Sequence, residues 1–303
     1  MLLFQILFYL NFWGSIALLC TGKIPAQISY GIPLTIMYLV VIAAVFNSRK
    51  LIGNSFFRLF VVSSFLNLVV YYNSFFLLYL PNFLEHDSPL INFYLNLPQW
   101  LLRLDYMMCY HFAYLQYIVI LLMTINRFTV MGFPIKYKKI WSHKNLTILL
   151  ISCAILPFLA TYRLLLSDIQ WESIDNGIQM KHDPETITLS MTILSYFMGI
   201  ITSLTLLIGV VTAFLMKKYR FEKVNKYYRE ISFITFYNTL LQLFVTSITV
   251  LSTNYAQFNF LRVQIIPHAT HLLSFSNFAV VFIFVKPVKR NVMCFLFGFI
   301  DGE

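Results

Sequence analysis

The sequence predicts an all-α membrane protein, a seven-transmembrane helix bundle with its N-terminus outside the cell and its C-terminus in the cytosol. Three observations predict this fold class: an excess of apolar residues, seven long apolar runs, and an uneven distribution of Lys and Arg between the connections. Of the 303 residues, 59% are hydrophobic and only 11% are charged, whereas a soluble domain has about 25% charged residues. The basic residues behind the net charge of +10 form short clusters between apolar runs, which favours anionic lipid over nucleic acid as their partner.

Seven apolar runs bounded by polar or charged residues are close to or longer than the roughly 20 residues that a spanning helix needs. They fall at about residues 30–47, 53–80, 99–127, 146–166, 187–216, 231–254 and 264–285. Each is expected to be helical, because unpaired backbone groups are costly in hydrocarbon and a helix pairs them within the segment. Only modest loops remain, so residues 23–290 are expected to form one seven-transmembrane domain, followed by a short tail at 291–303.

The orientation follows from the basic residues, since short loops rich in Lys and Arg stay in the cytosol. The first, third and fifth connections together with the C-terminal tail hold seventeen of the 22 Lys and Arg residues, and the opposite side holds five. The N-terminus and the acidic loop 167–186 are therefore expected outside the cell.

Residues 1–22 are apolar and aromatic but lack the basic start of a signal peptide. Three interpretations stay open: a cleaved signal peptide, an uncleaved interfacial helix, and an eighth span. An eighth span would place the N-terminus inside and conflict with the charge count. Within the runs, Pro157 and Pro267 predict kinks in the fourth and seventh spans.

The inner end of the third span has the order Asn126, Arg127, Phe128, with Pro134 seven residues after the Arg. A charged group at the mouth of a helix bundle is costly, so it is usually retained for a partner or a function. The alternative is that Arg127 only ends the helix and extends to lipid phosphate.

The outer half of the third span is a candidate ligand-binding surface. Tyr106, Tyr110 and Tyr114 recur every four residues, with Tyr117 one turn further in, so they share one helical face. If that face points into the bundle, its rings and hydroxyls suit a small organic ligand. The alternatives are packing against neighbouring helices or, for Tyr106 especially, an interfacial aromatic belt.

Four further residues complete the candidate ligand set. Asp105 and His111 lie beside the tyrosines, although Asp105 also has Arg103 nearby as a simple ion-pair partner. His268 and His271 share a face of the seventh span at its outer end, where they are expected to contact ligand or to sense pH. Two histidines without a third ligand argue against a metal site, and no cofactor is expected.

The stretch MTINRFTVMGFPIKYKKIW at residues 123–141 resembles the signature of nematode serpentine chemoreceptors of the class gamma and class V group. The shared motifs are Asn-Arg-Phe-Thr, a Phe-Pro pair and the ending Tyr-x-Lys-Ile-Trp. More distantly, Arg127 and Pro134 resemble the Asp-Arg-Tyr motif and second-loop Pro of rhodopsin-like receptors. The resemblance implies a chemosensory G-protein-coupled receptor for a small-molecule ligand in the plasma membrane of sensory cilia. It also implies that Asn126, Arg127, Phe128 and Pro134 form a switch facing a heterotrimeric G protein.

Three departures separate the chain from the rhodopsin-like pattern. Asn126 stands where an acid is usual, the sixth span has no Trp-x-Pro, and Asn277-Phe278 replaces the start of Asn-Pro-x-x-Tyr. The outer loop 167–186 contains no Cys, so it cannot form the usual disulfide to the third helix and is expected to be looser.

A transporter or channel is the second functional class that the sequence allows. Against it, the ionisable residues lie at span ends, and no chain of acids suits an ion relay. An enzyme is not expected, because the six histidines form no cluster and no nucleophile stands beside a base.

Overall fold

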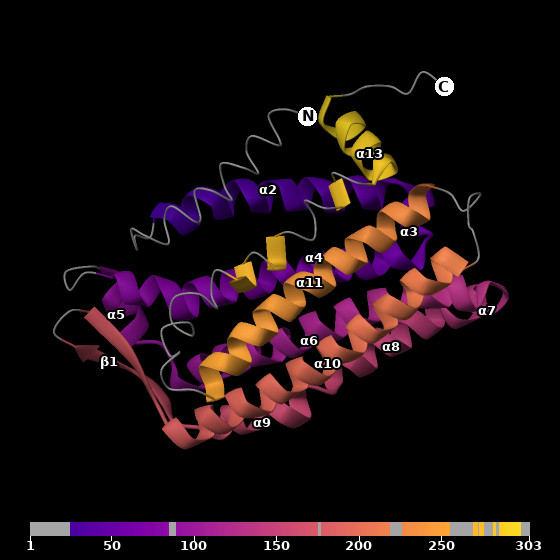
Figure 1. Cartoon of the computed structure of the whole chain (residues 1–303). Helices are drawn as coiled ribbons and strands as arrows, with labels where there is room; N and C mark the ends of the chain where they lie inside the picture. The colour runs from indigo at the N-terminus through magenta and orange to yellow at the C-terminus, as the bar shows by residue number, and fades with distance from the viewer. Residues whose placement is uncertain are drawn as a thin grey trace.

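The computed structural model describes residues 25–84, 89–174, 177–218, 226–254, 269–271, 273–275, 281–282 and 285–297. Long helices run side by side through most of this part of the chain (Figure 1). The expectations for residues 1–22, Pro267 and His268 lie outside the described residues. The expected seventh span at 264–285 is described only in short pieces.

Helices make up nearly all of the described chain, and a single hairpin is the exception. The elements in order are α2 (Pro25–Asn47), α3 (Arg49–Ile52), α4 (Ser55–Ser74), the π-helical turn η1 (Phe75–Tyr79), the 3-10 turn η2 (Leu80–Phe83), α5 (Pro89–Leu95), α6 (Gln99–Gly132), α7 (Pro134–Ile140), α8 (His143–Ile155), α9 (Phe158–Leu166), β1 (Ile169–Ile174), β2 (Gly177–His182), α10 (Pro184–Lys218), α11 (Lys226–Asn254) and α13 (Lys286–Phe297).

The described helices match the predicted spans closely. Five helical stretches are long and apolar enough to cross a membrane: Ser55–Leu77, Gln99–Gly132, His143–Leu166, Pro184–Lys217 and Ser232–Asn254. The first predicted span corresponds to a shorter apolar stretch of α2, Gly31–Asn47. At 34 residues, α6 is about 50 Å long and therefore exceeds a hydrocarbon core of about 30 Å.

Helix α6 occupies the centre of the bundle. In its most apolar part 67% of residues are buried, against 17% in the most apolar part of His143–Leu166, which contains α8 and α9. It packs against α4, α9, α10 and α11. The side chains of α6 are therefore the ones best placed to connect the other helices.

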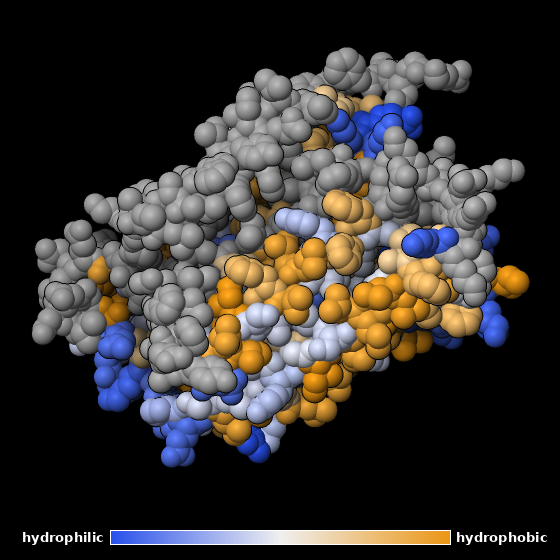
Figure 2. Space-filling model, viewed as in Figure 1, coloured by the Kyte–Doolittle hydropathy of each residue, from blue (hydrophilic) through white to orange (hydrophobic). Residues whose placement is uncertain are grey.

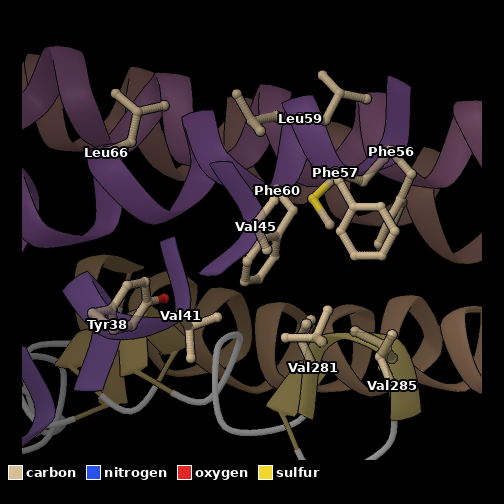
Figure 3. Packing of buried hydrophobic residues seen from close by; sticks show 14 of the residues in the cluster. Tyr38, Val41, Val45, Phe56, Phe57, Leu59, Phe60, Leu66, Val281 and Val285 are labelled. Atoms are coloured by element: carbon tan, nitrogen blue, oxygen red, sulfur yellow. The ribbon is translucent and has the colours of Figure 1, made fainter. Parts of the chain in front are cut away.

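The main apolar core joins α2, α4, α6 and the described pieces of the seventh span. Val41 and Val45 of α2 and Phe60 of α4 are almost fully buried there, together with Val281 and Val285 (Figure 3). Apolar side chains also cover outward-facing surfaces, and Figure 2 shows them along the flank of α10 and α11. Leu207 and Phe214 of α10 are strongly exposed, which suits contact with lipid rather than water.

The predicted kink in the fourth span is confirmed. Helix α8 ends at Ile155 and α9 begins at Phe158, so the break falls at Pro157. Proline has no amide hydrogen to donate to the preceding turn, and the next turn starts afresh with the Thr161 amide donating to the Pro157 carbonyl at 3.0 Å.

The loop 167–186 contains an antiparallel hairpin that the sequence analysis did not predict. Strands β1 and β2 pair from Ile169 opposite His182 to Ile174 opposite Gly177. The side chains of Ile169 and Ile178 are buried, and the ring of Trp171 packs edge-on against Tyr94 of α5. Hairpin and α5 lie at one end of the bundle, here called the hairpin end, and α7 lies at the opposite α7 end (Figure 1).

Candidate functional site

A cluster of polar side chains closes the α7 end of the bundle. We call it the α7-end cluster, and its members come from α4, α6, α7 and the residue after α7. They are Ser55 of α4, Asn126, Arg127 and Thr129 of α6, Tyr137 of α7, and Trp141. Asn126 is 0% and Arg127 is 1% exposed. Side chains this polar are buried only when other groups compensate for the lost water.

Asn126 connects three helices through its amide. Its Nδ2 donates to Ser55 Oγ at 2.9 Å and approaches Tyr137 Oη at 3.4 Å. Ser55 Oγ and Tyr137 Oη are themselves 2.7 Å apart. The end of α6, the start of α4 and the middle of α7 therefore share one hydrogen-bond network.

The Arg127 guanidinium lies over the ring of Phe56, with Cζ 3.8 Å from the ring centroid. Contact of this kind between a cation and an aromatic face is worth about 2 kcal/mol or more when desolvated. The side chain is enclosed by the bundle, so it does not extend to lipid phosphate as the alternative interpretation supposed.

The rest of the signature stretch forms the turn into α7. Trp141 Nε1 donates to Thr129 Oγ1 at 2.6 Å, and Thr129 Oγ1 donates to the Asn126 carbonyl at 2.9 Å. The ring of Phe128 packs edge-on against Phe133. Pro134 is exposed and occupies the first turn of α7, where its fixed φ and missing amide hydrogen are tolerated.

The tyrosine face, defined as Tyr106, Tyr110, Tyr114 and Tyr117, points into the bundle. All four residues are buried in one apolar cluster with residues of α10 and α11. Tyr114 packs against Phe197 of α10, and Tyr117 Oη lies 3.1 Å from Thr246 Oγ1 of α11. Tyr106 also lies within this cluster, with its hydroxyl 3.3 Å from that of Tyr110, so it is not part of an exposed belt.

Two further candidate ligand residues, His111 and His271, pack against aromatic rings of other helices. The His111 ring is 4.2 Å from that of Phe158 in α9, so it faces away from the tyrosine face. His271 packs edge-on against Tyr71 of α4 at 4.7 Å. The structure therefore joins Tyr110 and Tyr114 in one cluster, and it places His111 against α9 and His271 against α4.

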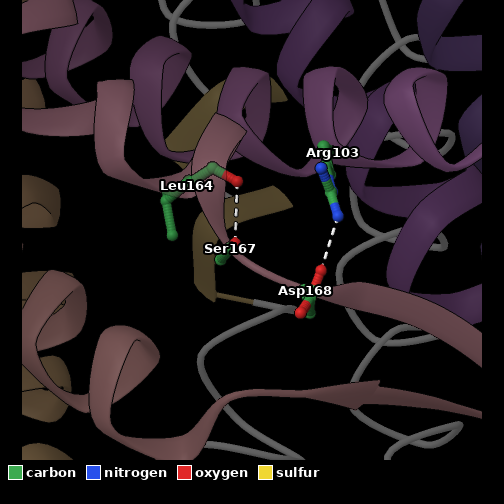
Figure 4. A network of polar contacts seen from close by, with 4 residues as sticks. All are labelled: Arg103, Leu164, Ser167 and Asp168. Carbon is green, nitrogen blue, oxygen red and sulfur yellow. Dashed lines mark hydrogen bonds and ion pairs between the residues drawn. The ribbon is translucent and has the colours of Figure 1, made fainter.

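Asp105 has a different neighbourhood from the expected one. Its main-chain carbonyl accepts a 3.2 Å hydrogen bond from Asn73 Nδ2 of α4. The alternative that Asp105 pairs with Arg103 is not the arrangement found, because Arg103 donates to Asp168 at 2.6 Å (Figure 4). A charged contact thus joins the start of α6 to the residue that precedes β1.

A second polar network near the middle of the bundle was missed by the sequence analysis. We call it the central hub; its members are Tyr38 of α2, Asn67 of α4, Gln116 of α6 and Ser274 in the described part of the seventh span. Asn67 Nδ2 donates to Tyr38 Oη at 3.0 Å and to the Ser274 carbonyl at 3.1 Å. Gln116 Nε2 donates to Asn67 Oδ1 at 2.7 Å and to Ser274 Oγ at 3.1 Å.

The hub joins four spans in the buried interior of the bundle. Tyr38 Oη also donates to the Ser274 carbonyl at 2.5 Å. Hydrogen bonds between helices in a membrane are worth about 0.6 to 2 kcal/mol each. The sequence signal for such residues is a lone amide inside an apolar run, as at Asn67 and Gln116.

Comparison with known proteins gives the family. The model of the family described as Srg family chemoreceptor matches residues 25–292. The chain belongs to the Srg family of chemoreceptors. Serpentine receptor class gamma-31 of Caenorhabditis elegans is 25% identical over 284 residues, covering 88% of this chain and 89% of the relative. Serpentine receptor class gamma-16 of the same organism is 30% identical over 140 residues, covering 46% of this chain and 43% of the relative.

Membership of the Srg family confirms the resemblance drawn from residues 123–141 and the seven-transmembrane fold class. In this Srg receptor the signature residues hydrogen-bond to one another. Asn126, Thr129, Tyr137 and Trp141 all do so within the α7-end cluster. The transporter or channel alternative is not favoured by a chemoreceptor family.

Proposed function

We propose that this Srg receptor couples a small-molecule ligand, bound in the half of the bundle nearer the hairpin, to a heterotrimeric G protein at the α7 end. The observation that carries the proposal is the α7-end cluster, where Asn126 joins α4, α6 and α7. A ligand that binds one arrangement of α6 more tightly than another shifts the population of arrangements. The cluster is the place where such a shift reaches the loop that contains α7.

The surface around the cluster supports a cytosolic partner. Lys136, Lys138 and Lys139 of α7 are exposed beside the buried Arg127. Ile135, between Pro134 and these lysines, is 95% exposed. A basic surface with an exposed apolar side chain suits an acidic protein surface or anionic headgroups.

The proposal includes the orientation and the place of action. Lys and Arg concentrate in the connections at the α7 end and in the tail, which supports a cytosolic α7 end and an N-terminus outside. We place the receptor in the plasma membrane, and by the family resemblance in that of sensory cilia; its description as a chemoreceptor supports a membrane that external chemicals reach.

A reporter assay tests the coupling. Cells that carry a promiscuous reporter G protein are screened with small organic compounds, and an active compound is then compared on wild type and Arg127→Ala at matched surface expression. We expect Arg127→Ala to lose most of the response, because Phe56 and the cluster lose the cation packed between them. Arg163→Ala is the control, since Arg163 is exposed in the last turn of α9. An unaltered response in Arg127→Ala would remove Arg127 from the mechanism.

A further inference from the structure

Gln242 of α11 is a buried amide with no hydrogen-bond partner. Its side chain is 0% exposed, and neither Oε1 nor Nε2 has a hydrogen-bond partner in the part of the chain that the structure describes. The residue lies near the middle of the apolar stretch Ser232–Asn254. A buried amide without a protein partner costs about 2 kcal/mol or more in a low-dielectric interior.

A second buried glutamine shows what a structural role looks like in the same bundle. Gln116 is 3% exposed, and its Nε2 donates to Asn67 and to Ser274 in the central hub. Native interiors pair nearly all buried polar groups in this way, so an unpaired one calls for an explanation. Gln242 is a site where stability is given up, and such sites are typical of function.

The surroundings of Gln242 connect it to the tyrosine face. Thr246, one turn along α11 on the same side, lies 3.1 Å from Tyr117 Oη and 3.0 Å from Thr202 Oγ1 of α10. Its neighbours Leu241 and Val245 belong to the apolar cluster that contains the tyrosine face. Gln242 therefore combines an unused donor and acceptor with an aromatic and aliphatic neighbourhood.

We infer that Gln242 binds the polar end of the ligand of this receptor, and that the ligand is a small, mainly apolar molecule with a donor and an acceptor on one group. A carboxamide or an un-ionised carboxylic acid fits best, because it forms two parallel hydrogen bonds with the Gln242 amide. The apolar remainder would pack against the cluster that includes Val245. The inference rests on the proposed function, because it names the ligand class of the proposed binding half.

The test uses the full chain in lipid nanodiscs without a G protein, so it does not depend on signalling. The variants are Gln242→Leu and its matched control Gln116→Leu, and the readout is Tm. We expect Gln242→Leu to hold or raise Tm by a few degrees, because it removes an unpaired amide. Gln116→Leu is expected to lower Tm, because it removes the donor to Asn67 Oδ1 and Ser274 Oγ.

The probes are straight-chain primary amides from butanamide to decanamide, each compared with the methyl ketone of matched length, which accepts but does not donate. We expect the best amide to raise the Tm of wild type more than its ketone does, and to bind Gln242→Leu about tenfold or more weakly. The inference is overturned if no amide exceeds its ketone on wild type, or if Gln242→Leu gains as much as wild type. A fall in Tm for Gln242→Leu as large as that for Gln116→Leu also overturns it, because it marks a structural amide paired through water.

The outcome separates this inference from the proposed coupling. If amides bind but give no reporter response, the proposed coupling to a G protein is rejected and the Gln242 ligand site is retained. If Gln242→Leu keeps the reporter response, the Gln242 ligand site is rejected and the proposed coupling is retained.

Discussion

Asn126 Nδ2 donates to Ser55 Oγ at 2.9 Å and so ties the residue before Arg127 to the start of α4. Both side chains are buried, and a hydrogen bond of this kind contributes about 1 kcal/mol to stability. Rhodopsin-like receptors have a charged acid at the position of Asn126, before the Arg. The neutral amide of Asn126 can both donate and accept hydrogen bonds.

The Asn126 to Ser55 bond predicts a measurable coupling between the two residues. In a double-mutant cycle of Asn126→Ala and Ser55→Ala, the coupling energy is expected to be about 1 kcal/mol. Thermal unfolding of the receptor in nanodiscs measures it. The cycle of Asn126→Ala with Ser203→Ala is the control, because Ser203 is exposed and bonds only within α10. Equal values in the two cycles would mean that the bond contributes nothing.

Gly31 of α2 packs directly on Tyr71 of α4. A Cβ added at Gly31 would overlap Tyr71 Oη, and Tyr71 is held in turn against His271 and Phe275. Gly31→Ala is therefore expected to lower stability by about 1 to 3 kcal/mol through overpacking. Tyr71→Phe should restore part of the loss, because it removes the overlapping oxygen.

Gly209→Ala is the matched control for Gly31→Ala. A Cβ at Gly209 of α10 meets nothing within 4 Å, so this change is expected to stabilise the helix by up to about 1 kcal/mol. Thermal unfolding of the two variants should move in opposite directions. A Gly31→Ala variant as stable as wild type would show that α2 and α4 are not in close contact at Gly31 and Tyr71.

The fold class and the spans were predictable because hydropathy depends only on local composition. The first six predicted spans agree with described helices to within a few residues at most ends, and the break at Pro157 follows from the chemistry of proline. The hairpin was not predicted, because β1 and β2 occur in a short polar loop whose strands are stabilised by packing on α5 and α6. Local patterns do not show that contact.

The candidate site was predictable only in part, because side chains close in sequence need not share a surface. Tyr110 and His111 are neighbours in the chain, yet successive residues of a helix point about 100° apart. Tyr110 therefore meets the bundle interior while His111 meets Phe158. The partners of Asn67 and Gln116 depend on how four helices are rotated against one another, which no single apolar run encodes.

Asp183 caps α10, and its role predicts a dependence on pH. The hydroxyl of Thr186 and then the amide of Glu185 donate to its carboxylate, and these bonds hold the pKa of Asp183 below its usual value. A lowered pKa in the folded state means that the stabilisation is complete above the unfolded pKa of about 4. It is lost as the pH falls through the lower, folded pKa.

Hydrogen exchange at the start of α10 measures the effect of this cap. At neutral pH we expect Asp183→Ala to speed the exchange of the amides of Glu185 and Thr186, which lose their acceptor. The difference from wild type should shrink below the folded pKa. Asp183→Asn should stay close to wild type at neutral pH and lose the dependence on pH. A difference that is constant down to strongly acidic pH would exclude the carboxylate as its cause.

The central hub predicts a large penalty for one substitution on α4. Asn67→Leu removes the group that donates to Tyr38 Oη and the Ser274 carbonyl and that accepts from Gln116. Each buried polar group left unpaired costs about 1 to 3 kcal/mol, so we expect a total loss of about 3 kcal/mol and a clear fall in Tm.

Asn254→Leu is the matched control for Asn67→Leu, because its exposed amide donates only to the Val250 carbonyl of its own helix. Its Tm should stay close to that of wild type. If the two variants lose the same stability, the hub does not hold the four spans together. If only Asn67→Leu is destabilised and Gln116→Leu adds little further loss to it, the two amides act as one unit, as expected for residues that share Ser274.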